Sequence, residues 1–238
     1  MLILAVVQAL MLSAIVLTVA LAAVLGATLA PDKGLATLPI AAMVIGTAVA
    51  SLPAAILMRK HGRRAGFLLG AALGIGGSLL CALALYERSF SVFVAGHLLL
   101  GSYQGFANYY RFAAVETADP GHASQAISLV VAGGVAAFLG PQLGQWGRDW
   151  TGGQPFEGSY LAQGALSLIA LILLFRLELP KMATAYGGAP RPLGEIFGQP
   201  ALQVSIFGAA VGYAVMTMVM TATPLGKRRF IREFWQRL

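Results

Sequence analysis

The sequence of 238 residues has few charged side chains and one cysteine. Asp, Glu, Lys and Arg together make up 11% of the chain, whereas soluble domains carry about 25% because a folded surface must be solvated. The composition therefore excludes a soluble globular protein. The single cysteine, Cys81, excludes a disulfide scaffold. Apolar residues make up 58% of the chain, which predicts an integral membrane protein with several spans.

The charged residues lie in clusters that are separated by long uncharged runs. A helix needs about 20 residues to cross a hydrocarbon core about 30 Å thick, and each run is long enough to cross once and too short to cross twice. Barrel strands are excluded because they alternate in polarity over about ten residues. The sequence therefore predicts an all-α fold with seven transmembrane helices, in the runs 1–31, 34–58, 65–86, 89–110, 120–147, 158–175 and 196–226.

The positions of Lys and Arg in the loops predict the orientation, because cytoplasmic loops carry an excess of both. When the loops are assigned alternately to the two sides, one side holds eight of these residues and the other holds three. The eight are Arg59, Lys60, Arg63, Arg64, Arg111, Arg176, Lys181 and Arg191, and the three are Lys33, Arg88 and Arg148. The N-terminus is therefore expected in the cytoplasm. The net charge of +7 reflects this topology and does not indicate nucleic-acid binding.

A proline-containing segment of mixed charge divides the chain after the sixth predicted helix. The sequence predicts four parts: a six-helix transmembrane bundle over residues 1–177, a cytoplasmic linker over 178–198, a seventh transmembrane helix over 199–225 and a basic amphipathic tail over 226–238. Seven spans place this tail outside, although five Lys or Arg among its residues disfavour that side.

The loop between the second and third predicted helices reads Ala55-Ile-Leu-Met-Arg59-Lys60-His61-Gly62-Arg63-Arg64. It resembles the signature loop of the major facilitator superfamily, commonly Gly-x-Leu-Ala-Asp-Arg-x-Gly-Arg-Arg. Ala55 and Arg59 replace the glycine and the aspartate, and in the family this acid is associated with a charge contact that stabilises one transport state. The resemblance implies a conformational-switch loop made of Arg59, Lys60, Gly62, Arg63 and Arg64.

Two further segments resemble the same family. The fifth predicted helix contains Gly133, Gly140, Pro141 and Gly144, similar to a glycine-proline motif that is associated mainly with antiporters. In the fourth, Gly101-Ser-Tyr-Gln104-Gly105 is similar to Arg-x-x-Gln-Gly, with glycine in place of the arginine. The resemblance implies the six-helix N-terminal bundle of a twelve-helix fold, plus one further helix. The fifth-helix glycines form either a static packing face or a seam along which helices rock.

Polar side chains inside the spans are the candidates to line a solute path. The fourth predicted helix is the most polar, and its amide and aromatic groups suit a planar organic solute. No Asp, Glu, Lys or Arg lies well inside a span, so the chain has no carboxylate of its own for proton coupling. The substrate-lining candidates are Gln8, Tyr103, Gln104, Asn108, Gln203 and Tyr213.

His97 and Cys81 are the histidine and the cysteine inside the predicted spans, and they predict no metal site and no cofactor. His97 is the single histidine inside a span and has no second ligand, so we expect it to make a helix–helix hydrogen bond, and Cys81 to pack as a small apolar residue. The chain lacks a His-Glu-x-x-His pattern, and an enzyme is not expected.

These observations together predict a secondary transporter in the plasma (inner) membrane that moves a small organic solute by alternating access. Its expected partners are the lipid bilayer and the solute, with coupling to a proton or another ion left open. The basic tail favours a truncated or frame-shifted permease that lacks its C-terminal half, and an interfacial helix is the competing explanation. The alternative functions are a non-transporting truncated membrane fragment and a seven-helix membrane sensor or receptor.

Overall fold

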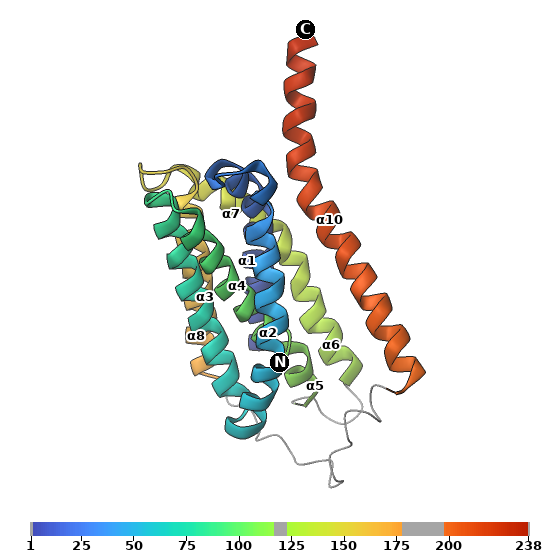
Figure 1. Ribbon diagram of the computed structural model, residues 1–238. Coiled ribbons are helices and arrows are strands. Elements are labelled where there is room, and N and C mark those ends of the chain that lie inside the picture. The colour runs from blue at the N-terminus through green and yellow to red at the C-terminus, as the bar shows by residue number, and fades with distance from the viewer. Residues whose placement is uncertain (1, 117–122, 178–197, 238) are drawn as a thin grey trace. The chain divides into compact units, whose positions relative to one another are not determined.

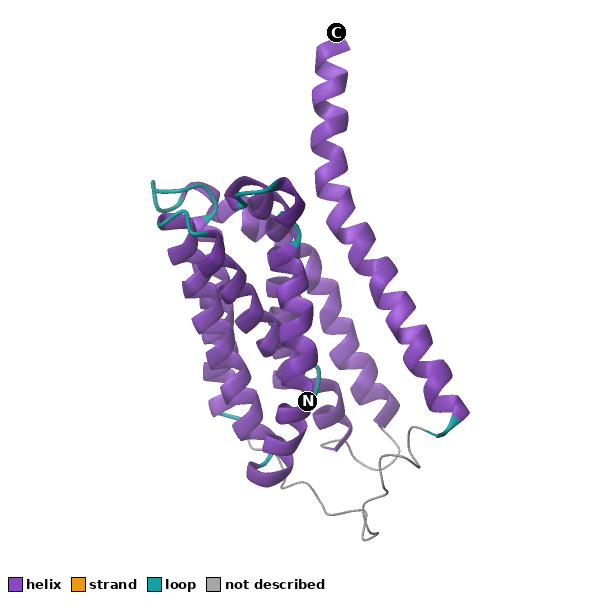
Figure 2. Cartoon of the chain, viewed as in Figure 1, coloured by secondary structure: helices purple, strands orange, loops and turns teal. Residues whose placement is uncertain are grey.

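The computed structural model describes residues 2–116, 123–177 and 198–237 (Figure 1). All of the regular structure in these ranges is helical, and no strand occurs in them (Figure 2). The all-α membrane fold expected from the composition is thus confirmed. The chain divides into two compact units, Met1–Met182 and Ala183–Leu238, and each is described by itself.

The described residues of the first unit form helices of 7 to 28 residues. They are α1 Leu2–Leu29, α2 Leu38–His61, α3 Arg63–Tyr86, α4 Phe90–Ala107, α5 Tyr110–Glu116, α6 Ala123–Ala132, α7 Leu139–Trp146 and α8 Glu157–Phe175. Three 3₁₀ segments lie between them: η1 Lys33–Leu35, η2 Gly133–Phe138 and η3 Gly147–Asp149.

Five helical segments in the described ranges are long and apolar enough to cross a membrane. They coincide with the first, second, third, sixth and seventh predicted spans. The fourth predicted span is α4, followed after a short turn by α5, and the fifth is divided into α6, η2 and α7. The paired glycines Gly133 and Gly134 start η2, because residues without side chains hold an α-helix weakly. The number of crossings stays a prediction.

The helices of the first unit stand side by side and pack in a defined order (Figure 1). Helix α2 packs along α4, and α3 packs along both α4 and α8. Helix α1 packs against α8 and the successive α6, η2 and α7 segments. Aliphatic and aromatic side chains fill two clusters. The first includes Phe67, Tyr103 and Tyr110, and the second includes Cys81, Phe93 and Tyr160.

Glycine allows the closest of these approaches. A Cβ atom at Gly101 of α4 would overlap the carbonyl oxygen of Met43 on α2, and one at Gly46 of α2 would overlap that of Leu98 on α4. Membrane helices associate through such tight packing because lipid removes the hydrophobic driving force between them. The α2–α4 pair therefore holds the polar residues of α4 at a fixed distance from α2.

The described residues of the second unit, 198–237, form the long helix α10, which spans Pro200–Arg237. The sequence predicted a seventh transmembrane helix over 199–225 and a basic amphipathic tail over 226–238. Helix α10 continues through residue 226, and the division into these two parts stays a prediction. The side chains beyond Val219 and the linker residues 178–197 lie outside the described part of the chain.

Candidate functional site

Polar side chains in the last turn of α4, and in the turn that follows it, meet polar groups of α2. The Thr47 hydroxyl lies within hydrogen-bond distance of three acceptors: the Met43 carbonyl at 3.0 Å, the Gly101 carbonyl at 3.0 Å and the Gln104 side-chain oxygen at 3.2 Å. One turn further along, the Tyr109 hydroxyl donates to the Ser51 carbonyl at 3.1 Å. Both Gln104 and Tyr109 are half-buried. The Gln104 amide nitrogen is thereby left to donate elsewhere.

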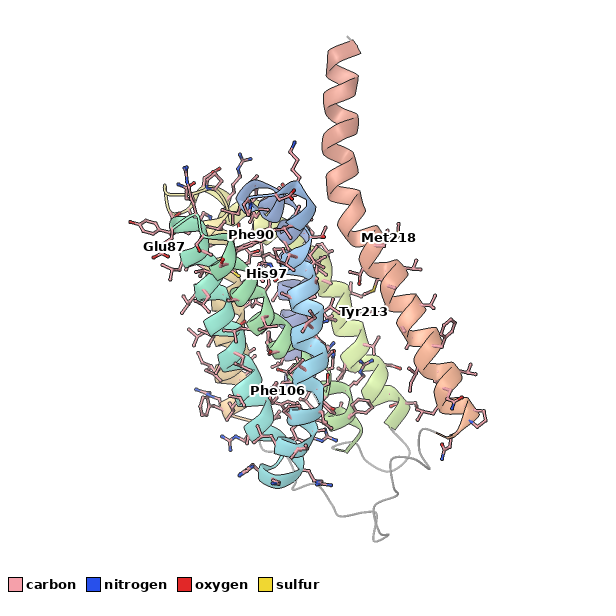
Figure 3. The ribbon with its side chains drawn as sticks, viewed as in Figure 1. Glu87, Phe90, His97, Phe106, Tyr213 and Met218 are labelled. Carbon is pink, nitrogen blue, oxygen red and sulfur yellow. The ribbon has the colours of Figure 1, made fainter. Side chains whose placement is uncertain are left out.

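Tyr103, Phe106 and Tyr110 share a face of the α4–α5 region, and the structure places this face inside the core. Tyr103 lies over Gly74 of α3, where a Cβ would come within 2.8 Å of its ring. The ring of Tyr110 lies edge-on to Phe67 at 4.6 Å between centroids. Figure 3 shows Phe106 within the same unit. In this conformation Tyr103 therefore contacts neighbouring helices, and its role in lining a path stays a prediction.

The other lining candidates are divided between the two units. Gln8 is half-buried on α1, and Asn108 is half-buried at the end of α4. Gln203 and Tyr213 lie on α10 in the second unit, where both are exposed (Figure 3). Tyr103, Gln104 and Asn108 thus lie close in sequence at the C-terminal end of α4, and the lining role of all six candidates stays a prediction.

Two buried polar residues of α8 were missed by the sequence analysis. Gln163 and Ser167 are 2% and 1% exposed, and the side-chain oxygen of each has no hydrogen-bond partner among the described residues. Buried polar atoms are normally paired with protein or ordered water. Ser167 lies beside Tyr103, because both approach Gly74. The sequence signal that could have found them is the recurrence of polar residues every four positions in α8, at Ser159, Gln163 and Ser167.

The α2–α3 loop is a sharp turn that glycine makes possible. Gly62 has φ +85° and ψ 158°, a backbone conformation that is essentially restricted to glycine. Arg59 and Lys60 are exposed before it, and Arg63 begins α3 after it. The Arg64 guanidinium donates to the Phe175 carbonyl, at the C-terminal end of α8, where a cation is favoured by the helix dipole. The loop is therefore attached to the end of α8, and its role in switching stays a prediction.

The fifth-helix glycines lie along α1. A Cβ added to Gly133 would lie 2.6 Å from the Ala5 carbonyl oxygen. A Cβ added to Gly140 would lie 2.5 Å from the Ser13 carbonyl oxygen. The Ser13 hydroxyl donates to the Ala136 carbonyl at 2.8 Å. A Cβ at Gly144 would make ordinary contacts with Leu17 and Leu21, while Pro141 is exposed. The structure thus shows close packing, and whether this face moves during transport stays a prediction.

His97 joins α4 to α8 near the other end of the bundle (Figure 3). Its Nδ1 lies 2.8 Å from the Phe93 carbonyl, which can only accept, so Nδ1 carries the proton. Its Nε2 accepts from the Tyr160 hydroxyl at 3.4 Å. The expected helix–helix bond is confirmed, and Cys81 is buried beside it. Among the residues that the structure describes, no cluster of His, Cys, Asp and Glu could hold a metal ion.

A bundle of long apolar helices, with charges at its two ends and uncharged polar groups between the helices, defines a multi-pass membrane protein. The family profile described as Major Facilitator Superfamily matches residues 1–230, and the chain belongs to this family. The expected family is confirmed. Membership indicates a transporter rather than an enzyme, and it does not favour the alternatives of an inert fragment or a sensor.

Two curated relatives are similar over most of the chain. The riboflavin transporter RfnT of Brucella anthropi is 40% identical over 227 residues, which cover 94% of this chain and 57% of the relative. An uncharacterised transporter of the same type, YddS of Bacillus subtilis, is 27% identical over 222 residues, which cover 84% of this chain and 51% of the relative. The chain therefore spans about half the length of the curated relatives that it matches.

Proposed function

We propose that this chain supplies the N-terminal helices of a secondary transporter that moves riboflavin, or a closely similar planar solute, across the plasma membrane by alternating access. The observation that carries the proposal is the 40% identity to a riboflavin transporter over 94% of this chain. The N-terminus and the α2–α3 loop face the cytoplasm, because the cationic loops lie on that side. The remaining helices of the transporter are supplied by a second segment that completes the path.

The chemistry of the α4 region supports an uncharged aromatic solute. The isoalloxazine ring of riboflavin is planar, and its edge carries both hydrogen-bond donors and acceptors. The half-buried amides of Gln104 and Asn108 can donate and accept, and the half-buried Tyr109 ring offers a stacking surface. The interior of the spans has no ionised group that would select an anion or a cation. Such a lining suits a neutral solute with several polar atoms.

The test is uptake of radiolabelled riboflavin by a riboflavin-requiring bacterium that has no transporter of its own. Cells express the chain alone, or the chain together with the C-terminal half of the Brucella anthropi relative. We expect uptake above the empty-vector level at least in the paired sample. Absence of uptake in both samples, with the protein present in the membrane fraction, would overturn the proposal.

A matched pair of variants connects uptake to the α4 amide. Gln104→Leu removes the amide and keeps the volume, and we expect about a tenfold loss of uptake at low riboflavin concentration, as for one lost hydrogen bond. Thr47→Val removes the α2 partner of the same amide but leaves the amide in place. This control is expected to retain most of the uptake. Equal losses in the two variants would assign Gln104 to helix packing alone.

A further inference from the structure

One end of the first unit is strongly cationic. The α2–α3 turn, the start of α5 and the end of α8 lie at this end, and their exposed cations are Arg59, Lys60, Arg64, Arg111 and Arg176. The carboxylates whose side chains the structure describes all lie at the opposite end, and these are Asp32, Glu87, Asp149 and Glu157. The cations are therefore not neutralised by any described carboxylate of the same end.

Two of these cations come from different helices and meet at one corner. Helices α3 and α8 pack along each other, and Arg64 at the start of α3 donates to the Phe175 carbonyl at the end of α8. Arg176 follows Phe175 directly in the chain. The hydrogen bond thus places the Arg64 guanidinium beside the residue that carries the second guanidinium. We name Arg64, Leu168, Ile172, Phe175 and Arg176 the α3–α8 corner.

An apolar strip leads along α8 toward these two cations. Leu168, Ile172 and Phe175 recur at helical spacing on one side of α8 and are 47%, 51% and 55% exposed. Side chains of this kind, in a helix that spans the membrane, contact lipid chains. The strip ends at Arg176, where the apolar surface gives way to positive charge.

We propose that the α3–α8 corner binds one anionic phospholipid, with its phosphate on Arg64 and Arg176 and an acyl chain along the strip. Arginine suits the phosphate because its planar guanidinium presents paired donors to two oxygens. Basic sites between helices on the cytoplasmic side attract anionic headgroups for the same reason. Arg64 uses part of its guanidinium on the Phe175 carbonyl, which fixes the position of the rest. A zwitterionic lipid has the same chains but no net charge, so it gains less.

The test is native mass spectrometry of the 238-residue chain in a neutral detergent, titrated with phosphatidylglycerol or with phosphatidylcholine of the same acyl chains. We expect the first phosphatidylglycerol to bind at least fivefold more tightly than phosphatidylcholine. Each cation removed, by Arg64→Gln or Arg176→Gln, is expected to weaken phosphatidylglycerol binding by about fivefold. Equal affinity for the two lipids overturns the proposal. So does unchanged phosphatidylglycerol binding in the variant that carries both Arg64→Gln and Arg176→Gln.

Three controls separate a lipid site from general charge and from misfolding. Lys33→Gln with Arg88→Gln removes two cations from the opposite end, and this variant is expected to bind phosphatidylglycerol like the parent. Arg64→Lys keeps the charge and is expected to lose less affinity than Arg64→Gln. If Arg64→Gln lowers the melting midpoint, Arg176→Gln alone still tests the site. Glycerol 3-phosphate supplies the headgroup chemistry without chains, and its binding as tightly as the lipid overturns the proposal.

Discussion

Gly101 illustrates how a single missing side chain fixes the position of the candidate path. Met43 of α2 lies so close that any Cβ at residue 101 would overlap its carbonyl oxygen. One turn along, a Cβ added to Gly105 would lie 2.9 Å from the Thr47 carbonyl oxygen. The Thr47–Gln104 contact lies between these two glycines. The close backbone approach is thus a condition for the amide of α4 to reach α2.

Substituting Gly101 with alanine is expected to destabilise the bundle. The added methyl group forces α2 and α4 apart, and overpacking of this kind typically costs about 1–3 kcal/mol. The measurement is the melting midpoint of the detergent-solubilised protein, followed by size-exclusion chromatography. Gly76→Ala is the control, since nothing in the described chain lies within 4 Å of its Cβ position, and alanine is the better helix former. A Gly101→Ala protein as stable as Gly76→Ala would contradict the packing account.

The Tyr160 hydroxyl offers a second test at the same scale. Tyr160→Phe removes the donor to His97 Nε2 and leaves the aromatic packing against Phe93 in place. Interhelical hydrogen bonds in membrane proteins contribute about 0.6 kcal/mol on average, so we expect a small fall in the melting midpoint. The exposed Tyr86→Phe is expected to melt like the parent. Indistinguishable midpoints for the two variants would show that the bond contributes nothing measurable.

Among the elements, the fifth predicted span is divided by a 3₁₀ segment into α6, η2 and α7, and it packs against α1. The 3₁₀ segment η2 lies between α6 and α7, and it packs along α1. Glycines on this side allow contact, while Val135 and Phe138 of η2 are exposed. The segment therefore has one face against α1 and one face away from it. This arrangement permits the two faces to be tested separately.

Gly140→Leu is expected to abolish stable protein or transport. Its Cβ position lies 2.5 Å from the Ser13 carbonyl and 2.9 Å from the Leu17 nitrogen, so a leucine cannot fit unless α7 leaves α1. Protein level in the membrane and riboflavin uptake are the measurements. Val135→Leu places a leucine on the exposed face and is expected to behave like the parent. Normal level and uptake in Gly140→Leu would show that α1 and α7 separate freely.

For the whole molecule, the two ends of the first unit differ in charge, and this difference predicts its orientation. Lys60 lies at the cationic end, and Thr151 is exposed at the end that carries the described carboxylates. The native Cys81 is buried, so it gives little background to a thiol reagent. Cysteine introduced at either position therefore reports on the side of the membrane where that end lies.

Thr151→Cys is expected to react with a membrane-impermeant maleimide in intact cells, and Lys60→Cys only after the cells are permeabilised. The reason is the excess of Lys and Arg in cytoplasmic loops. The measurement is the fraction of labelled protein before and after permeabilisation, with the parent as the background control. The reverse pattern would show that the N-terminus faces outward.

Sequence patterns predicted the helical class and the loop positions, because charge must leave the hydrocarbon wherever the chain turns. The family resemblance also came from local motifs around Gly62 and Gly140. Contacts between helices could not be read in this way. The sequence did not show that the Tyr103 ring lies against Gly74 of α3. Gln163 and Ser167 were missed because their run is apolar on average. These contacts depend on which face of each helix packs against its neighbour, and composition does not determine that.

The six residues of η2 are wound more tightly than an α-helix, and this affects the length of the segment. A 3₁₀ helix rises about 2.0 Å per residue and an α-helix about 1.5 Å. Converting the six residues of η2 to an α-helix would therefore shorten this segment by about 3 Å and rotate one of its ends by about 120° relative to the other. Because the Ser13 hydroxyl of α1 donates to the Ala136 carbonyl within η2, such a rotation would require that bond to break. The winding of η2 is therefore linked to its contact with α1.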